Sequence, residues 1–256
     1  DHHRSVPFLA ARVSETLGLH YKMPWPRREL QSARNLRVSP LFARLAGGGE
    51  NGENGGGENG GGDGGGLVPA WGEKYGWERV NYFAPPDFDA PLAGDGEAGY
   101  TFGQPRWHDL VAAEHKACRE GAVLFDVTSF AKTLVQGRDA EGFLQRVCAN
   151  DVGVEPGKMV YTGMLNERGG YEADVTVTRL DEFSYSVISP TGSAVRDQAH
   201  LRRHVGPSEF VTVTDATSGS AVLSVMGPRA RELLQRASGE VVGDDRDGGD
   251  LTGTDD

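Results

Sequence analysis

Residues 105–237 alternate between two spacings of apolar side chains. Apolar positions three and four residues apart predict helices, whereas alternation with polar positions predicts strands half-buried in a sheet. Hairpins mixed with single helices indicate an α+β domain and not a doubly wound parallel sheet. The predicted helices cover 105–121, 138–151, 191–205 and 228–237, and the predicted strands cover 122–127, 132–136, 159–165, 171–178, 183–189, 209–214 and 221–226.

Particular residues define the ends and faces of these elements. The first helix should carry Trp107, Leu110, Val111 and Cys118 on one stripe, and the second Phe143, Leu144 and Val147. Thr191 is expected to cap the third helix, and Pro228 is well placed to begin the fourth. The segment Asn-Glu-Arg-Gly-Gly at 166–170 predicts a hairpin turn, because glycine supplies positive φ angles.

The first hundred residues are less regular. A helical spacing covers 8–18, and two prolines interrupt the stretch 20–26, where an extended, clamping segment is expected. Residues 71–87 are rich in aromatic side chains that should anchor this lead-in to the following domain. Between them, residues 47–66 contain thirteen glycines among Glu, Asn and Asp, and are expected to form a disordered insertion.

The net charge of −11 comes almost entirely from two segments. Residues 47–66 hold four acids and no base, and residues 239–256 hold seven acids and one base, which together give −10. The near-neutral remainder offers no electrostatic reason to expect nucleic acid or an anionic membrane as a partner. No apolar run is long enough to span a membrane. Because the chain starts without Met, it is expected to be an internal piece of a longer protein or a partial gene product.

Three further motifs favour unremarkable interpretations. The pattern G-x-G-x-x-G occurs at 47–52 and 55–60, but no strand precedes and no helix follows it, so a dinucleotide loop is not expected. His200 and His204 could face one metal ion, yet no third ligand is suggested, so a solvated basic helix face is preferred. Cys118 and Cys148 are thirty residues apart, which favours two buried thiols in a reducing compartment.

The stretch 161–180, YTGMLNERGGYEADVTVTRL, resembles the hairpin of the glycine-cleavage T-protein (aminomethyltransferase) family. LFDVTSFAKTLVQGRDAEGFLQRVCANDV and AVLSVMGPRARELLQ resemble two further units of that family. HYKMPWPRRELQSARNLRVSPLFARL and WGEKYGWERVNYFAPPD resemble the segment between the flavin and folate domains of dimethylglycine and sarcosine dehydrogenases. The same segment occurs in the regulatory subunit of pyruvate dehydrogenase phosphatase.

The resemblance implies specific roles for three residues. Asp174 matches the catalytic carboxylate that faces the reactive nitrogens of folate, Tyr161 matches a tyrosine of the same pocket, and Phe130 stands where the family has a methionine beside the pterin. On the predicted strand, alternation places Asp174 on the face opposite the valines. An ordinary solvent-facing polar side would explain that alternation equally well. Pro190 replaces a family asparagine, so one polar contact to the ligand is expected to be lost.

The resemblance also implies a division of the chain. Residues 1–46 are expected to end the flavin domain, 67–99 to connect it, 100–237 to form an incomplete folate-binding domain and 238–256 to form an acidic tail. The cofactors would be tetrahydrofolate and, in an upstream domain, FAD. The family's second half supplies a glutamate and an arginine for folate, so these 256 residues alone are expected to be inactive.

Two functions remain open, beside a third possibility, a degenerate gene fragment with no stable function. One is a dehydrogenase that passes a one-carbon unit from an N-methylated glycine to tetrahydrofolate, with a small amine and folate as partners. The other is a non-catalytic regulatory subunit whose partner is the catalytic subunit of pyruvate dehydrogenase phosphatase. The implied location is the mitochondrial matrix in a eukaryote and the cytoplasm otherwise.

Overall fold

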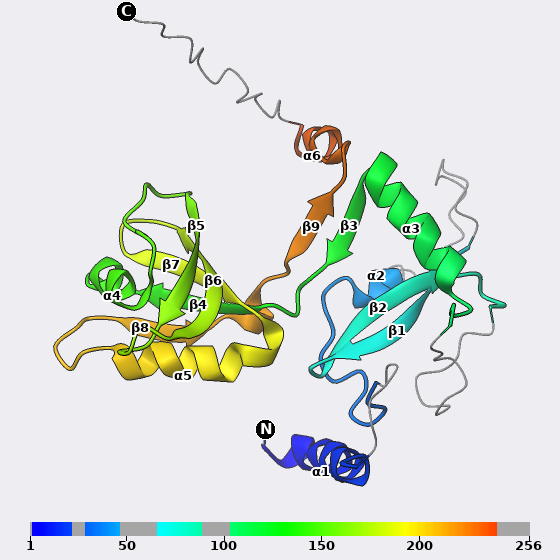
Figure 1. Cartoon of the computed structure of the whole chain (residues 1–256), viewed down its shortest axis with the longest axis horizontal. Coiled ribbons are helices and arrows are strands. Elements are labelled where there is room, and N and C mark those ends of the chain that lie inside the picture. The colour runs from blue at the N-terminus through cyan, green and yellow to red at the C-terminus, as the bar shows by residue number, and fades with distance from the viewer. Residues whose placement is uncertain (1, 22–28, 47–65, 89–102, 240–256) are drawn as a thin grey trace, which may run out of the picture.

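The computed structural model describes residues 2–21, 29–46, 66–88 and 103–239. Figure 1 shows a sheet-containing lobe, built mostly from β4–β8 with α4 and α5, and a second group of elements around the hairpin β1–β2. The antiparallel ladder of β3 (Val123–Asp126) and β9 (Leu223–Met226) runs between them. Helices thus accompany antiparallel sheets, which confirms the predicted α+β class.

The large lobe is built on a five-stranded antiparallel sheet in the order β5-β6-β7-β4-β8. Two hairpins, β5–β6 and the adjoining β6–β7, form one side of this sheet, and β8 is its other edge. The strand positions predicted from alternation are found with ends displaced by at most three residues, and β5 matches its prediction at both ends. The strands are β4 (Ala131–Gln136), β5 (Met159–Leu165), β6 (Tyr171–Arg179), β7 (Ser184–Ser189) and β8 (Thr212–Asp215).

One face of this sheet forms the hydrophobic core. On β6 the inward residues Ala173, Val175 and Val177 are buried, because a strand turns alternate side chains to opposite faces. Helix α4 (Ala140–Val147) adds its predicted apolar stripe, and α5 (Ala194–His204) adds Leu201. The core also includes Val135, Cys148, Val152, Met164, Tyr185 and Val187.

The turn between β5 and β6 has the predicted chemistry. Gly169 has a φ of 73°, which a side chain would disfavour, and the Asn166 backbone closes the turn by pairing with Gly170. The Asn166 side-chain oxygen accepts hydrogen bonds from the backbone N–H groups of Arg168 and Gly170, at 3.0 and 2.9 Å. Asn166 therefore holds the turn with both its backbone and its side chain.

A second hairpin, β1 (Val68–Lys74) and β2 (Trp77–Ala84), was not predicted. Its two-residue turn is Tyr75–Gly76, and both residues have positive φ, 50° and 84°. Such a turn matches the twist of the flanking strands, but tyrosine is an uncommon residue in it. The aromatic residues of 71–87 were interpreted only as anchors.

The lead-in packs against this hairpin through charged and aromatic contacts. Helix α1 (His2–Gly18) is followed by a stretch in which the Arg34 guanidinium forms an ion pair of 2.6 Å with the buried Glu78 carboxylate of β2. In the short helix α2 (Phe42–Leu45), the Phe42 ring lies 4.4 Å from the Trp71 ring on β1. The clamping segment expected at 20–26 falls mainly outside the described residues.

Helix α3 (His108–Glu120) differs from its prediction. It contains no buried residue, and Val111 is 41% exposed, so the expected apolar stripe does not form a core. Trp107 instead stacks on Tyr82 of β2, with ring centroids 5.6 Å apart. Further along α3, the Glu114 carboxylate accepts a hydrogen bond of 2.7 Å from the Phe83 N–H of β2, so polar and aromatic contacts attach the helix to the hairpin.

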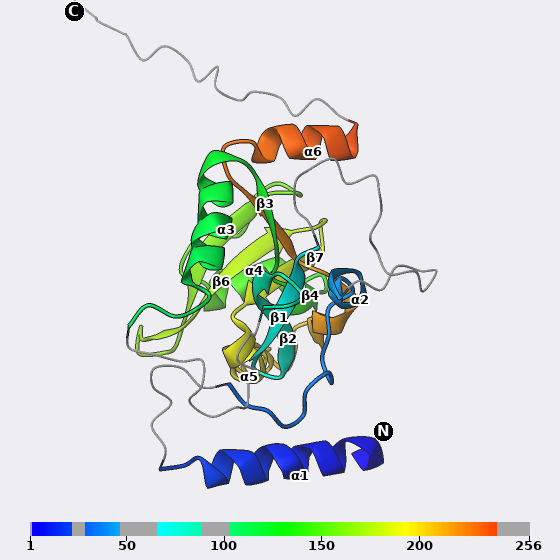
Figure 2. The same ribbon diagram turned by 90° about the vertical axis from the view of Figure 1, so that its right-hand side faces the viewer.

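The predicted cap at Thr191 is wrong. A 3-10 turn, η1 (Thr191–Ser193), precedes α5, and the Thr191 hydroxyl donates a hydrogen bond of 3.2 Å to the Ser129 hydroxyl. Helix α6 (Ala230–Ser238) begins two residues after Pro228. Figure 2 shows α6 and α1 at opposite ends of the molecule.

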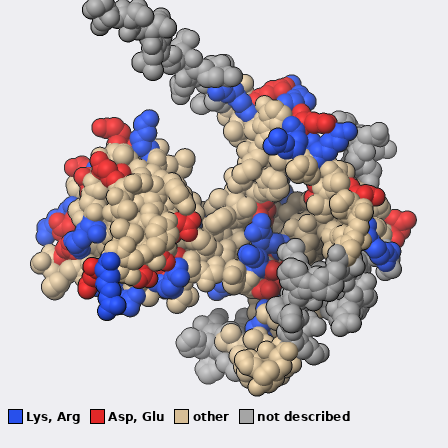
Figure 3. Space-filling view, in the orientation of Figure 1, with Lys and Arg blue, Asp and Glu red and all other residues tan. Residues whose placement is uncertain are grey.

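The predicted disordered insertion and acidic tail lie almost wholly outside the described residues. In the part of the chain that is described, no helix is long and apolar enough to cross a bilayer. Within the same residues, no group of three or more His, Cys, Asp or Glu side chains could hold a metal ion. Figure 3 shows basic and acidic side chains interspersed on the face drawn.

Candidate functional site

The face of the five-stranded sheet opposite the core carries the predicted site. Tyr161 and Gly163 on β5 alternate with buried Thr162 and Met164, so they lie on the outer face. In the β5–β6 register, Gly163 is paired with Asp174. Asp174 is exposed between the buried residues of β6, as its alternation predicted. The two predicted polar residues therefore meet on one open surface.

The side chains of Tyr161 and Asp174 are in contact. The Tyr161 hydroxyl donates a hydrogen bond to Asp174 Oδ2 at 3.2 Å, and Tyr161 is 66% exposed. The negative charge of Asp174, followed by this hydrogen bond, raises the pKa of Tyr161. A tyrosine so placed keeps its proton, orients one carboxylate oxygen and leaves the other oxygen available to a ligand.

Phe130 and Pro190 lie in the same row of the sheet. In the β6–β7 register Thr176 is opposite Ile188, and extending that register by two residues places Asp174 opposite Pro190. In the β4–β7 register Ala131 is opposite Ser189, and extending it by one residue places Phe130 opposite Pro190. The sequence-predicted residues thus come from neighbouring positions across four strands, although Phe130 and Pro190 stand just beyond the paired segments.

A buried polar network fixes the backbone before Phe130. The Lys132 ammonium, on a residue that is 5% exposed, donates a hydrogen bond of 2.7 Å to the Thr128 carbonyl, and burial lowers the pKa of Lys132. The Thr128 N–H donates to Asp126 Oδ1 at 3.0 Å. The other carboxylate oxygen of Asp126 accepts from the Ser39 hydroxyl. This chain of contacts ties the lead-in to the loop that carries Phe130.

Sequence reasoning missed Tyr171 and Gly163. The Tyr171 ring occupies the space that a Cβ on Gly163 would need, so it lies over the residue paired with Asp174. Tyr171 is 63% exposed and also contributes to the raised pKa of Tyr161. The only signal in the sequence was a tyrosine directly after the two glycines of the turn, which resembled an ordinary strand residue.

The prediction that His200 and His204 form a solvated basic face is wrong for His200. His200 is 3% exposed, and its Nε2 has no hydrogen-bond partner among the described residues. His204 Nδ1 lies 2.8 Å from the His200 carbonyl oxygen, and the two ring centroids are 4.3 Å apart. Burial lowers the pKa of His200. His200 lines a surface groove between α5 and the β5–β6 hairpin, together with Glu172 and Arg203.

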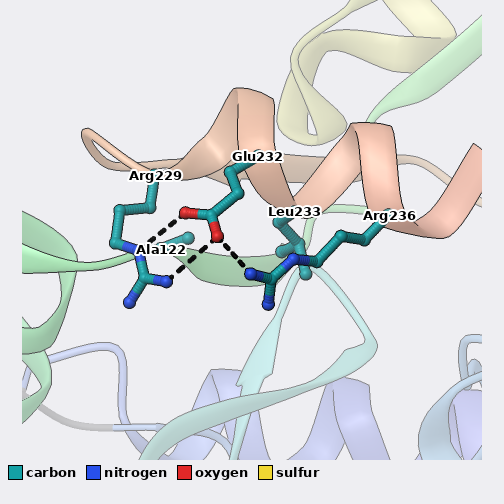
Figure 4. A pocket seen from close by; sticks show the side chains of 5 residues that line it. All are labelled: Ala122, Arg229, Glu232, Leu233 and Arg236. Carbon is teal, nitrogen blue, oxygen red and sulfur yellow. Dashed lines mark hydrogen bonds and ion pairs between the residues drawn. The ribbon is translucent and has the colours of Figure 1, made fainter. Parts of the chain in front are cut away.

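A second surface pocket lies beside α6 and carries arginines. Figure 4 shows that Arg229 and Arg236 both contact the Glu232 carboxylate, above Ala122 and Leu233. The Arg229 Nε–Glu232 Oε2 distance is 2.9 Å. Because one carboxylate engages both guanidinium groups, this pocket offers less charge to an anion than its two arginines alone would suggest.

Comparisons with known proteins show which family the chain resembles. Residues 68–246 match the GCVT N-terminal domain family, and residues 1–39 match the FAD dependent oxidoreductase central domain family. The chain is 38% identical to a 4-methylaminobutanoate oxidase (formaldehyde-forming) of Paenarthrobacter nicotinovorans, over 93% of this chain and 26% of that protein. It is 36% identical to the mitochondrial pyruvate dehydrogenase phosphatase regulatory subunit of Mus musculus, over 91% of this chain and 24% of that protein.

The fold is similar to that of a solved aminomethyltransferase. The crystal structure of glycine cleavage system aminomethyltransferase T from Bartonella henselae aligns with a TM-score of 0.52 at 24% identity, covering 79% of this chain and 44% of that chain. The chain spans about a quarter of the length of the two curated relatives.

Proposed function

Because the chain belongs to the GCVT N-terminal domain family, we propose that it is the tetrahydrofolate-binding part of an FAD-dependent amine dehydrogenase-like protein. The proposed reaction passes a one-carbon unit from an N-methylated amine, such as dimethylglycine or sarcosine, to tetrahydrofolate. The observation that carries the proposal is the contact between Tyr161 and Asp174 on an open sheet face. The relative named 4-methylaminobutanoate oxidase supports an amine as the substrate.

The residues of this face suit a reduced folate. A flat pterin can lie against the exposed Tyr161 ring, and the Asp174 carboxylate can accept hydrogen bonds from ring nitrogens. Gly163 carries no side chain of its own, and the Tyr171 ring lies over it beside Asp174. Bound tetrahydrofolate would supply a nucleophilic nitrogen.

The chain's own groups then have defined roles. Asp174 stabilises the positive charge of an iminium donor and accepts the proton released as the new carbon–nitrogen bond forms. Tyr161 is a positioning residue in this step, because its hydroxyl holds Asp174 Oδ2 and leaves Oδ1 free for the proton. Phe130 would form an apolar edge of the site, held by the network around Lys132.

FAD is assigned to a part of the protein outside the described residues. Only residues 1–39 match the FAD-related family, and within the described part of this segment the chain forms α1 and irregular backbone. In the described part of these residues, no phosphate-binding glycine loop lies between a strand and a helix.

A test uses the full-length protein with Asp174 replaced by Asn. This change keeps the side-chain volume but removes the charge and the proton acceptor. Transfer to tetrahydrofolate should fall about a hundredfold, the usual effect of losing an acid–base group, while flavin reduction by the amine stays unchanged and formaldehyde accumulates. Asp109→Asn, in an exposed carboxylate of α3, is the matched control. Transfer at the parent rate in Asp174→Asn would contradict the proposal.

The second candidate function is regulatory. The identity to the phosphatase regulatory subunit, 36%, is close to the 38% shared with the oxidase. In this function the same fold would hold a phosphatase catalytic subunit, in the mitochondrial matrix. A full-length protein that neither reduces flavin with an amine nor binds folate, and that associates with the phosphatase, would support this alternative.

A further inference from the structure

The β5–β6 hairpin contains a β-bulge beside the candidate site. Met164 is paired with Ala173, but Leu165 is paired with Tyr171, so Glu172 is an extra residue on β6. A bulge changes the face to which neighbouring side chains point. It brings Tyr171 to the same surface as Tyr161 and Asp174, although simple alternation from Ala173 would have turned it toward the core.

Gly163 makes room for the redirected ring. A Cβ at this position would collide with the Tyr171 ring, and Gly163 is the residue paired with Asp174. The ring therefore covers the backbone of Gly163, next to the strand position of Asp174. Any side chain at position 163 would displace Tyr171.

The three side chains form one cluster. The Tyr161 hydroxyl contacts Asp174 at 3.2 Å, and both Asp174 and Tyr171 influence the proton affinity of Tyr161. Tyr161 and Tyr171 are 66% and 63% exposed, so their ring surfaces are accessible to a ligand. Among the described residues, no lysine or arginine forms an ion pair with Asp174.

Two aromatic rings beside an unneutralised carboxylate attract an organic cation. Ring faces attract cations through the negative potential of the π-system, and methylated ammonium groups are favoured because they are weakly hydrated. A metal ion would need more oxygen or nitrogen ligands, and the described residues provide no cluster of three such acidic, histidine or cysteine side chains.

We propose that Tyr161, Tyr171 and Asp174, arranged over Gly163, form a binding site for N-methylated ammonium or iminium groups. This inference rests on the proposed function, which supplies a donor of that class, and it names Tyr171 as a specificity-determining residue. The cluster selects the donor by its positive charge and its methyl groups.

The test is NMR titration of the isotope-labelled chain with tetramethylammonium chloride and, separately, with the neutral alcohol 3,3-dimethyl-1-butanol. The two probes share a quaternary centre of similar size and differ in charge. The cation should shift the amide signals of Gly163, Tyr171 and Asp174, and sodium chloride at equal concentration should not. The alcohol should bind at least about twofold more weakly than the cation, because an exposed cation–π contact contributes about a two- to fivefold difference in affinity. Equal binding of both probes would overturn the proposal.

Variants separate the ring from other effects. Tyr171→Phe keeps the aromatic face and should bind the cation as the parent does, whereas Tyr171→Leu keeps apolar volume without a ring and should lose at least half of the affinity. Asp174→Asn should reduce binding further. Tyr21→Leu, at a tyrosine that is 97% exposed and far along the chain, is the matched control. Unchanged cation binding in Tyr171→Leu, with well-dispersed spectra showing an intact fold, would rule out the site.

A calorimetric titration of the full-length protein with 5-formyltetrahydrofolate distinguishes this inference from the proposed function. Binding of the reduced folate without preference for the cation would overturn the cation site alone. Preference for the cation without folate binding would uphold the site and contradict the folate function.

Discussion

At the scale of single residues, the proposed site depends on the electrostatic coupling between Tyr161 and Asp174. The raised pKa of Tyr161 is caused first by the negative charge of Asp174 and then by the hydrogen bond between them. Both causes act on an exposed surface, where water and salt weaken them. The coupling is therefore useful as a marker of geometry and not as a source of stability.

Replacing Asp174 by Asn should lower the pKa of Tyr161 toward the usual tyrosine value. The phenolate, which the carboxylate repels, becomes easier to form when that charge is removed. The measurement is a pH titration of the tyrosine Cζ signals by carbon-13 NMR, with Tyr161→Phe used to assign the resonance. If Tyr161 titrates identically in both proteins, the two side chains are not in contact in solution.

The two cysteines, predicted as a buried pair, differ in their surroundings. Cys148 is buried at the end of α4, and burial raises its pKa to about 12, so its thiol is protonated at neutral pH. Cys118 in α3 is only partly buried. The sequence could not separate them, because both lie in segments with helical spacing.

At the scale of elements, the sequence predicted the β5–β6 hairpin but not its functional detail. Asn166 and the glycines that follow it are a local signal, and the strands' alternation placed Asp174 correctly on the outer face. The bulge at Leu165 and Tyr171 depends on how the twisted strands pair, which no local pattern reveals. The position of Tyr171 was therefore beyond sequence reasoning.

The same limit applies to α5 and to β1–β2. The basic segment His-Leu-Arg-Arg-His suggested solvent exposure, yet packing against the β5–β6 hairpin buries His200. In the β1–β2 turn, Tyr75 stands before Gly76 where Asn or Asp would be the usual residue, so the sequence lacked the usual signal for a hairpin. At His200, tertiary contacts outweighed the local preference of the segment.

The buried His200 should make the stability of the chain depend on pH. Burial holds its pKa below the usual 6.5, with His204 and Arg203 opposing its charge and Glu172 favouring it. As the pH falls below 6.5, the unfolded chain binds a proton that the folded chain resists, so stability present at neutral pH is lost until the folded pKa is passed.

Urea unfolding at pH 7.5 and 5.5 measures this loss. His200→Gln should show a smaller decrease in the free energy of unfolding than the parent, and His115→Gln, in an exposed histidine of α3, should behave as the parent. An identical pH dependence in His200→Gln and the parent would show that His200 is not buried in solution.

At the scale of the whole molecule, an apolar surface remains uncovered on β3–β9 and α6. A two-stranded ladder is only marginally stable by itself, and its exposed side chains favour contact with further apolar surface. Figure 1 shows the ladder between the two groups of elements, with α3 beside β3 and α6 following β9. The exposed apolar residues are Leu124, Phe125, Leu223, Met226, Leu233 and Leu234, each at least 42% exposed.

This surface should bind a hydrophobic dye such as ANS. The double change Leu124→Lys and Met226→Lys should reduce dye fluorescence while leaving the cooperative melting of the five-stranded lobe unchanged, because neither residue belongs to its core. Lys replacement of two exposed residues, Leu180 and Phe183, on the β6–β7 turn serves as the control. Dye binding that is unaffected by the β3–β9 changes would place the accessible apolar surface elsewhere.

The proposed function requires that the outer face of the β5–β6 hairpin bind a reduced folate. The most direct measurement is calorimetric titration of the full-length protein with 5-formyltetrahydrofolate, using the parent, Asp174→Asn and the control Asp109→Asn. Saturable binding is expected for the parent and the control, and clearly weaker binding for Asp174→Asn. No binding to the parent, or equally tight binding by Asp174→Asn, would contradict the proposed site.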